Sequence, residues 1–196
     1  MSDSPDVRAP GDWVVVGPGA VTSGVVVELR RALFLDRDGV INTDHGYVHT
    51  PGKTEWVPGI FELCRAAQEM GFALVVVTNQ AGIGRGYYSD AQFRGYTTWV
   101  HRQFQERGAS ILATYYCPEH PDATLPVYRT DSGYRKPQPG MLLQAARDWQ
   151  LDLPGSVLVG DQPTDIEAAR RAGLGRAFRV DESSFTDVAA WMRRCF

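Results

Sequence analysis

Two carboxylates follow a short apolar run in this sequence, with a single arginine between them. Residues 32–35 are wholly apolar, and Asp36, Asp38 and a glycine come directly after them. An apolar run of this length predicts a buried strand, and ligands of open α/β sheets bind beyond the carboxyl ends of the strands. The same residues could be an ordinary polar turn that closes the strand. The pair alone therefore leaves a catalytic and a structural interpretation open.

Further groups suited to phosphate chemistry stand at comparable points of the chain. Thr78 follows a strand predicted over residues 72–77, Asp161 follows one predicted over residues 156–159, and Lys136 precedes a helix. Parallel strands all point the same way, so groups at their carboxyl ends converge on one face of the sheet. We therefore expect these side chains to meet the two carboxylates in one site.

This set of groups fits phosphoryl transfer. One carboxylate can attack phosphorus and form an acyl phosphate, while a second protonates the leaving alkoxide and later deprotonates water. Like charges about 4 Å apart cost roughly 4 kcal/mol at an effective dielectric near 20, so clustered carboxylates would repel a phosphate dianion. A divalent cation removes that obstacle, and an all-oxygen site suits Mg²⁺. A lysine and a hydroxyl can then bind the phosphoryl oxygens.

The elements that position these groups alternate between strands and helices. This alternation predicts an α/β fold with a doubly wound, mostly parallel sheet and no large cap domain. The expected strands cover residues 32–35, 72–77, 111–116, 156–159 and 177–180, and the expected helices cover residues 60–70, 89–104, 140–149, 166–172 and 187–194. Residues 81–86 are interpreted as a flexible glycine turn, and their spacing does not match the dinucleotide-binding fingerprint.

The first thirty residues are predicted to form an extension of the main domain. A lead-in of polar residues precedes two β-branched clusters at residues 13–16 and 25–29, which are separated by turn formers and predict a hairpin. We expect this hairpin to cover an edge of the sheet. Residues 31–196 are then predicted to form one α/β domain.

Composition limits the classes of function that the chain can have. It has 196 residues, 43% of them hydrophobic, and a net charge of −3, which fits one domain and gives no electrostatic footprint for nucleic acid or membrane. No signal peptide or membrane-spanning stretch is recognisable. Three scattered cysteines suit a reducing compartment better than a disulfide scaffold. We expect a cytoplasmic monomer that acts on a small molecule.

Four motifs together resemble the haloacid-dehalogenase superfamily of phosphatases. They are DRDGVIN at residues 36–42, TNQ at 78–80, RKP at 135–137 and GDQPTD at 160–165. The resemblance extends from about residue 31 to residue 180. It implies that Asp36 is the nucleophile, that Asp38 is the general acid and base, and that Thr78 and Lys136 complete the catalytic set. It also implies that Mg²⁺ is bound by Asp36, Asp161 and the main-chain carbonyl of Asp38.

A narrower resemblance links the chain to the family of heptose-1,7-bisphosphate phosphatases. It rests on residues 44–49, 71–80 and 135–141. In that family the loop after the first motif and the arginine before the lysine help to recognise a sugar phosphate. The substrate-binding residues implied here are Asp44, His45, Gly46, Tyr47, Asn79, Gln80 and Arg135. The loop could instead be a solvated flap with surface histidines.

Other functions remain open on sequence grounds. Histidinol-phosphate phosphatases share these motifs, so side-by-side assays would be needed to separate the two substrates. A phosphate-accepting receiver domain also uses Asp, Thr, Lys and Mg²⁺ on a parallel sheet, but it lacks an acid/base residue two positions after the phosphorylated aspartate. A binding-only member of the superfamily is disfavoured because no catalytic position is missing.

Structural zinc is not expected. The resembling family usually carries Cys-x-His and then Cys-x-Cys directly before Arg-Lys-Pro. Here only Cys117 stands in register, His120 is displaced by one residue, and the later positions are Ser132 and Tyr134. Tetrahedral zinc needs four ligands of this kind. We expect packing to hold the loop instead, with Tyr115, Tyr116, Tyr128 and Tyr134 as the candidates.

Metal analysis of the purified protein tests this expectation. We predict a zinc content well below one equivalent per chain, because the ligand set is incomplete. Zinc at one equivalent would contradict the prediction.

Overall fold

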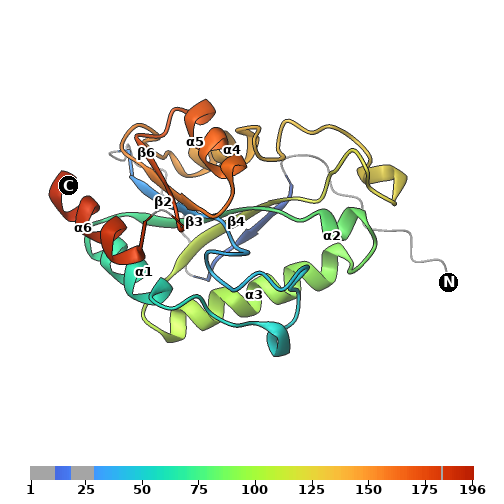
Figure 1. Cartoon of the computed structure of the whole chain (residues 1–196), viewed down its shortest axis with the longest axis horizontal. Coiled ribbons are helices and arrows are strands. Elements are labelled where there is room, and N and C mark those ends of the chain that lie inside the picture. Colours follow the sequence, from blue (N-terminus) through green and yellow to red (C-terminus); the bar gives the residue numbers. More distant parts are fainter. Residues whose placement is uncertain (1–11, 19–28, 182) are drawn as a thin grey trace.

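Six strands form one sheet in the computed structural model, which describes residues 12–18, 29–181 and 183–196 (Figure 1). The spatial order is β1-β4-β3-β2-β5-β6, and every neighbouring pair is parallel except β1 with β4. The strands are β1 (Val14–Val16), β2 (Ala32–Leu35), β3 (Ala73–Asn79), β4 (Ile111–Cys117), β5 (Val157–Gly160) and β6 (Arg176–Arg179). This architecture confirms the predicted α/β fold class.

Helices cover both faces of the sheet. They are α1 (Ile60–Glu69), α2 (Ala81–Gly84), α3 (Asp90–Glu106), α4 (Gly140–Trp149), α5 (Pro163–Ala172) and α6 (Phe185–Cys195), with short 3₁₀ turns at Pro51–Lys53 and Pro126–Tyr128. In Figure 1, α4 and α5 lie above the sheet, and α1, α3 and α6 lie below it. No helix in the described ranges is both long and apolar enough to cross a bilayer.

The central strand β2 shows why its sequence is continuously apolar. Phe34 packs into the layer that contains α4 and α5, whereas Leu33 and Leu35 pack into the layer that contains α1 and α6. All four residues of the strand are fully buried. A strand covered on both faces needs apolar side chains at every position, so the first polar residue after it, Asp36, marks where the chain leaves the strand.

The N-terminal cluster at residues 13–16 joins the sheet as β1. This strand pairs antiparallel with β4, Val14 lying opposite Tyr115, and Arg94 of α3 donates a hydrogen bond to the Val14 carbonyl oxygen at 2.7 Å. The strand therefore covers an edge of the main sheet, as expected of the predicted hairpin. Most of the second cluster, residues 25–28, lies outside the described residues.

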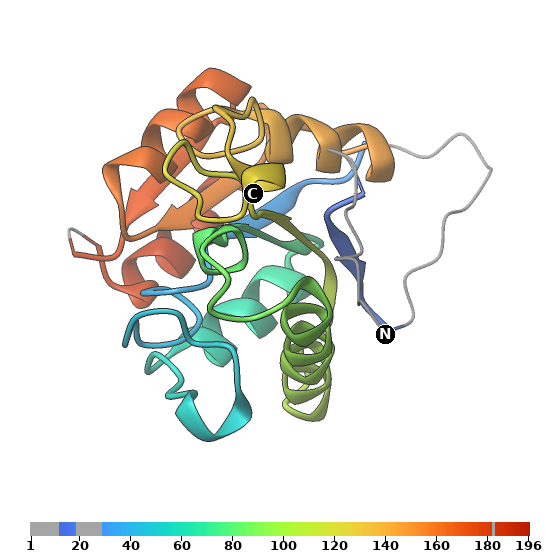
Figure 2. The same ribbon diagram turned by 90° about the vertical axis from the view of Figure 1, so that its right-hand side faces the viewer.

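The glycine-rich segment after β3 differs from the prediction of a flexible turn. It contains the short helix α2, in which Gly82, Ile83 and Gly84 are buried. A Cβ atom on Gly82 would lie 2.4 Å from the Tyr88 ring, and one on Gly84 would lie 2.6 Å from the Pro118 carbonyl oxygen. These glycines permit close packing rather than motion. Figure 2 shows α2 and the loop between β4 and α4 at the same end of the molecule, where Leu125 N donates to the Gly84 carbonyl oxygen at 2.9 Å.

Helix α5 begins three residues earlier than predicted. Pro163 occupies its first turn, and the Asp165 side chain accepts a hydrogen bond from the Gln162 amide as part of a capping box. Proline is suited to the first helical turn because its missing N–H would have no partner there. Gly173 ends the helix in a left-handed conformation with φ of 78°, as its position in the sequence predicts.

A buried histidine should make the stability of this fold depend on pH. His101 of α3 is 1% exposed, and its Nε2 lies 2.8 Å from Thr114 Oγ1. Burial lowers the pKa of His101 to about 4, so below the ordinary pKa of about 6.5 the unfolded chain binds a proton that the folded chain does not. The associated stability is present above pH 6.5 and is lost as the pH falls toward 4.

We predict that this histidine accounts for roughly 2–3 kcal/mol of the stability lost between pH 7.5 and pH 4.5. Urea unfolding of the wild type and of His101→Gln, which cannot titrate, would measure the difference. Parallel pH profiles for the two proteins would contradict the prediction.

Candidate active site

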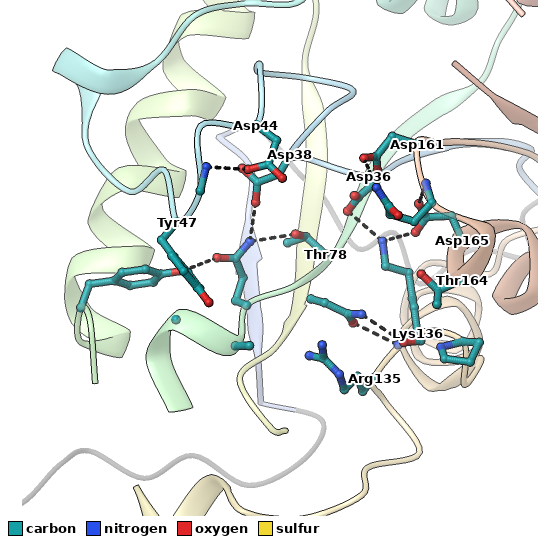
Figure 3. Close-up of a pocket in the computed structure, with 18 residues that line it drawn as sticks. Asp36, Asp38, Asp44, Tyr47, Thr78, Arg135, Lys136, Asp161, Thr164 and Asp165 are labelled. Carbon is teal, nitrogen blue, oxygen red and sulfur yellow. Dashed lines mark hydrogen bonds and ion pairs between the residues drawn. The ribbon is translucent and has the colours of Figure 1, made fainter. Parts of the chain in front are cut away.

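The carboxyl ends of β2, β3 and β5 border a pocket of about 630 Å³ (Figure 3). All the residues predicted to be catalytic or metal-binding line it: Asp36, Asp38, Thr78, Lys136 and Asp161. Six of the seven residues predicted to bind substrate line it as well: Asp44, Gly46, Tyr47, Asn79, Gln80 and Arg135. His45 does not, because its half-exposed ring pairs with Glu55 Oε2 at 2.9 Å. The structure thus brings together groups that are 100 residues apart in the chain.

Lys136 is the cation at the centre of this arrangement. Its side chain is 3% exposed, and its ammonium lies 2.7 Å from Asp36 Oδ1, 2.5 Å from Asp165 Oδ1 and 2.8 Å from the Val77 carbonyl oxygen. The Asn79 side chain fixes the lysine backbone, accepting from Lys136 N at 3.0 Å and donating to Lys136 O at 3.1 Å. Asn79 therefore supports the lysine, in addition to lining the pocket.

Two opposing effects set the pKa values in this cluster: burial disfavours the charged forms, and the neighbouring opposite charges favour them. Burial raises the pKa of Asp36 to about 7, although Lys136 opposes the rise. Burial would lower the pKa of Lys136, but Asp36 and Asp165 outweigh it and raise that pKa overall. One lysine thus faces two buried carboxylates. Its single positive charge does not balance both of them when they are ionised, so a further cation would be bound favourably.

A group of three acidic side chains offers the ligands for such a cation. Oxygens of Asp36, Asp161 and Asp165 lie within 4.8 Å of one another. Asp161 Oδ1 is buried and has no hydrogen-bond partner in the described chain, whereas Oδ2 accepts from Gln162 Nε2 at 2.7 Å. Asp165 already forms an ion pair with Lys136 through Oδ1 and accepts a hydrogen bond from the Gln162 backbone N–H through Oδ2. Oxygen-only ligands that include the unpartnered Asp161 Oδ1 fit Mg²⁺.

Two glycines make room for these carboxylates. Gly39 has φ of 84°, and a Cβ atom there would lie 2.5 Å from Asp161 Oδ2. A Cβ atom on Gly160 would lie 2.3 Å from Cβ of Asp165. Any larger residue at either position would displace an acidic side chain of the site.

Asp38 lies on the other side of Asp36 from this acidic group (Figure 3). It accepts hydrogen bonds from Arg37 Nη2 at 2.6 and 2.9 Å, from Asn42 Nδ2 at 3.0 Å and from Gln80 Nε2 at 3.2 Å. Gln80 also donates to Thr78 Oγ1 at 2.9 Å and accepts from Tyr88 at 2.6 Å. Gln80, predicted only to bind substrate, therefore links the acid/base candidate to the threonine.

Sequence reasoning assigned no role to three residues that build the site. Asp165 lies within the fourth motif, and its spacing from Gln162 signals a helix cap but not its contact with Lys136. Arg37 is buried with its guanidinium 5.4 Å from both the Phe93 and Tyr96 rings. Tyr88 lines the pocket from the segment before α3. None of these contacts has a local sequence signal.

The segment at residues 44–49 forms one wall of the pocket. Its turn is closed by the Gly46 amide, which donates to Asp44 Oδ1 at 2.8 Å, and Tyr47 has a φ of 54°. Arg85 donates to the Tyr47 hydroxyl, and the Tyr47 ring meets Tyr87 edge-on at 4.6 Å. His49 stacks on Tyr88 at 4.4 Å. Aromatic contacts and one arginine thus hold this segment against the pocket.

The loop between β4 and α4 is held by packing and hydrogen bonds in the described chain. Tyr134 meets Trp13 edge-on at 5.9 Å, and Arg129 donates to the carbonyl oxygens of Ala123 and Thr124 at 2.8 and 3.2 Å. Burial raises the pKa of the Cys117 thiol to about 11, which disfavours the thiolate that would bind a metal. This loop leads directly into Arg135 and Lys136.

Comparison with known proteins identifies the class. A profile of the family described as HAD-hydrolase-like matches residues 133–179. The structure superposes on a Mesorhizobium loti protein assigned to the HAD-like phosphatases, with a TM-score of 0.79 and 34% identity, covering 92% of this chain and 84% of the other. The chain has the fold of a HAD-like phosphatase.

More specific relatives are D-glycero-D-manno-heptose-1,7-bisphosphate 7-phosphatases. The Burkholderia mallei α-heptose enzyme is 48% identical over 82% of this chain and 85% of its own length, and the Escherichia coli K12 β-heptose enzyme is 45% identical over 74% and 75%. A D,D-heptose 1,7-bisphosphate phosphatase from B. bronchiseptica, complexed with magnesium and phosphate, superposes with a TM-score of 0.73 at 26% identity, covering 85% of this chain and 99% of the other. The chain belongs to this family of HAD-like phosphatases.

Replacing the buried lysine should destabilise the fold through its two partners. Lys136→Met leaves Asp36 and Asp165 buried without their cation, and removing one partner of a buried ion pair costs about 3–5 kcal/mol. Urea unfolding in the presence of a chelator would measure the loss. The matched control is Lys53→Met at the chain's other lysine, which is exposed and should cost less than about 0.5 kcal/mol. Equal effects of the two substitutions would contradict the role given to Lys136.

Proposed function

We propose that this protein is a Mg²⁺-dependent phosphatase that removes the 7-phosphate of D-glycero-D-manno-heptose 1,7-bisphosphate through a phosphoaspartyl intermediate. The observation on which this rests is the buried Asp36 carboxylate, which pairs with Lys136 at 2.7 Å and lines a pocket that Asp38 also lines. The sugar is inferred from the relatives named above. The predicted monomeric state and cytoplasmic location stay predictions.

Asp36, Asp161 and the main-chain carbonyl of Asp38 would bind the magnesium ion. The ion would neutralise charge on the phosphate and on the nucleophilic carboxylate while the two approach. Asp165 has another role in this proposal, because its Oδ1 pairs with the Lys136 ammonium and its Oδ2 accepts from the Gln162 backbone N–H. It orients Lys136.

The reaction proceeds in two displacements at phosphorus. An oxygen of Asp36 attacks the phosphorus, the bond to the sugar oxygen breaks, and Asp38 gives its proton to that oxygen. Asp38 then takes a proton from a water molecule, whose oxygen attacks the phosphoaspartyl phosphorus and releases Asp36 and inorganic phosphate. Lys136 and the Thr78 hydroxyl donate hydrogen bonds to the phosphoryl oxygens, where negative charge is spread in the transition state.

Substitutions of the two aspartates should have different consequences. Asp36→Asn removes the nucleophile, so turnover should be abolished. Asp38→Asn keeps the shape of the side chain and should still bind phosphate, while the rate falls roughly 10²- to 10⁴-fold through loss of proton transfer. Steady-state release of phosphate, together with phosphate binding by calorimetry, would measure both. Wild-type turnover by Asp36→Asn would exclude the mechanism.

A substrate panel separates the competing functions. Both anomers of the heptose bisphosphate and histidinol phosphate should be assayed side by side with Mg²⁺, and we expect the highest kcat/KM on a heptose bisphosphate. A higher value on histidinol phosphate would identify the alternative phosphatase. Release of no more than one equivalent of phosphate per chain would instead favour a receiver-like domain, which stores the phosphoryl group without turnover.

A further inference from the structure

A buried arginine pairs with the acid/base candidate from outside the pocket. Arg37 is 2% exposed and is not among the residues that line the pocket, whereas the side chain of Asp38 is 21% exposed and does line it. Arg37 Nη2 donates to Asp38 Oδ2 at 2.6 Å and to Asp38 Oδ1 at 2.9 Å. One guanidinium nitrogen therefore contacts both oxygens of the carboxylate, and it does so from a position that the substrate does not reach.

The guanidinium of Arg37 is itself held in place. Its central carbon lies 5.4 Å from the centres of the Phe93 and Tyr96 rings of α3, and the faces of aromatic rings attract a cation. Its Nε and Nη1 have no hydrogen-bond partner within the described ranges. A guanidinium stays charged at physiological pH, and a buried charge is costly unless it is paired. The side-chain hydrogen bonds of this buried charge are thus directed at one carboxylate, that of Asp38.

The other contacts of Asp38 leave a place for this arginine. The Arg37 carbonyl oxygen accepts from the Ile41 and Asn42 amides at 2.8 and 3.1 Å, which fixes the backbone around Asp38. Asn42 Nδ2 donates to Asp38 Oδ1 at 3.0 Å, but the Gln80 contact with Oδ2 is longer, at 3.2 Å. Hydrogen bonds between charged groups are shorter and stronger than neutral ones. Arg37 therefore supplies the strongest restraint on Asp38 Oδ2.

The proposed reaction requires Asp38 to act twice from one position. It gives a proton to the sugar oxygen as the bond from that oxygen to phosphorus breaks, and it then takes a proton from the attacking water. Both transfers need a carboxyl oxygen within hydrogen-bond reach of the reacting atom. A misplacement of about 1 Å can cost roughly 10²-fold in rate. A carboxyl group that rotated freely would satisfy this condition only part of the time.

We propose that Arg37 is a positioning residue that acts through Asp38, its guanidinium holding the carboxyl group in the orientation from which it protonates the leaving oxygen. This inference rests on the proposed function, because it concerns the acid/base step of that reaction. Arg37 makes no contact with the substrate in this role. Its replacement should therefore slow the reaction only where Asp38 is needed.

Two substrates with different leaving groups test this role. 4-Nitrophenyl phosphate releases a nitrophenolate that is stable without a proton, whereas the heptose bisphosphate releases an alkoxide that needs one. In Arg37→Met we expect kcat/KM on the bisphosphate to fall roughly 10²-fold, mainly through kcat. The loss on 4-nitrophenyl phosphate should be no more than a few-fold. Asp38→Asn is the benchmark and should show the same selectivity. Equal losses on the two substrates in Arg37→Met would overturn the positioning role.

Two further variants separate this role from a general loss of stability. Arg37→Lys keeps the charge on a single nitrogen and should show a smaller loss with the same selectivity. If Arg37→Met does not fold, Arg37→Lys decides, and an unchanged ratio of the two kcat/KM values would overturn the inference. Arg94→Met is the matched control, since Arg94 of α3 lies outside the pocket lining and donates to the Val14 carbonyl oxygen. It should leave that ratio unaltered, and the same selective loss in this control would contradict a specific role of Arg37.

A double variant tests whether Arg37 acts through Asp38. Adding Arg37→Met to Asp38→Asn should cause little further loss on the heptose bisphosphate, because the side chain that Arg37 positions has already lost its function. Losses that multiply would overturn the inference and leave the phosphatase intact.

Failure of the proposed function has a different signature. Equal losses of Asp38→Asn on both substrates would overturn the acid/base role of Asp38, and the positioning role with it. A wild type that hydrolyses 4-nitrophenyl phosphate but not the heptose bisphosphate would overturn the proposed substrate. The ratio of kcat/KM values would then be measured against histidinol phosphate, whose leaving group is also an alkoxide, and an unchanged ratio in Arg37→Met would still overturn the inference.

Discussion

The buried ion pair between Lys136 and Asp36 is the interaction on which the site depends. A charge removed from water is stable only when it is paired and hydrogen-bonded, and Lys136 meets that condition with Asp36, Asp165 and the Val77 carbonyl oxygen. These partners come from the ends of β2 and β3 and from α5. The three elements therefore have to be docked correctly before the lysine can be accommodated, which couples the site to the packing of the sheet.

The remaining geometry separates positive and negative groups around the phosphate. Carboxylates gather at the ends of β2 and β5, where Gly39 and Gly160 permit close approach. Asp38 is held away from that group by a buried arginine and two amides. Basic groups without carboxylate partners in the described chain lie toward Tyr47 and the loop before Lys136. A site divided in this way can orient an anionic substrate along a single direction.

Local sequence patterns were sufficient for the elements and for the principal catalytic candidates. Apolar runs locate the strands because both faces of the sheet are covered, and a polar residue directly after such a run marks the pocket. The predictions fail at positions where contacts between segments distant in the sequence determine the conformation or the partner of a residue. The glycines of α2 are needed because Tyr88 and Pro118 pack against them, and His45 is drawn to Glu55 rather than to the pocket. Likewise, Asp165 and Arg85 acquire roles only through partners on other elements.

The strand β1 has a practical consequence for any shortened form of the protein. Its backbone bonds to β4, and Trp13, 3% exposed, packs on Tyr134 just before Arg135. The sequence alone predicts that the N-terminal extension ends at about residue 30. Truncation there would remove β1 and expose the backbone N–H and C=O groups along one edge of β4. Such a bare edge invites intermolecular strand addition. Expression trials with trimmed chains would then encounter insolubility that originates far from Asp36 and Asp38.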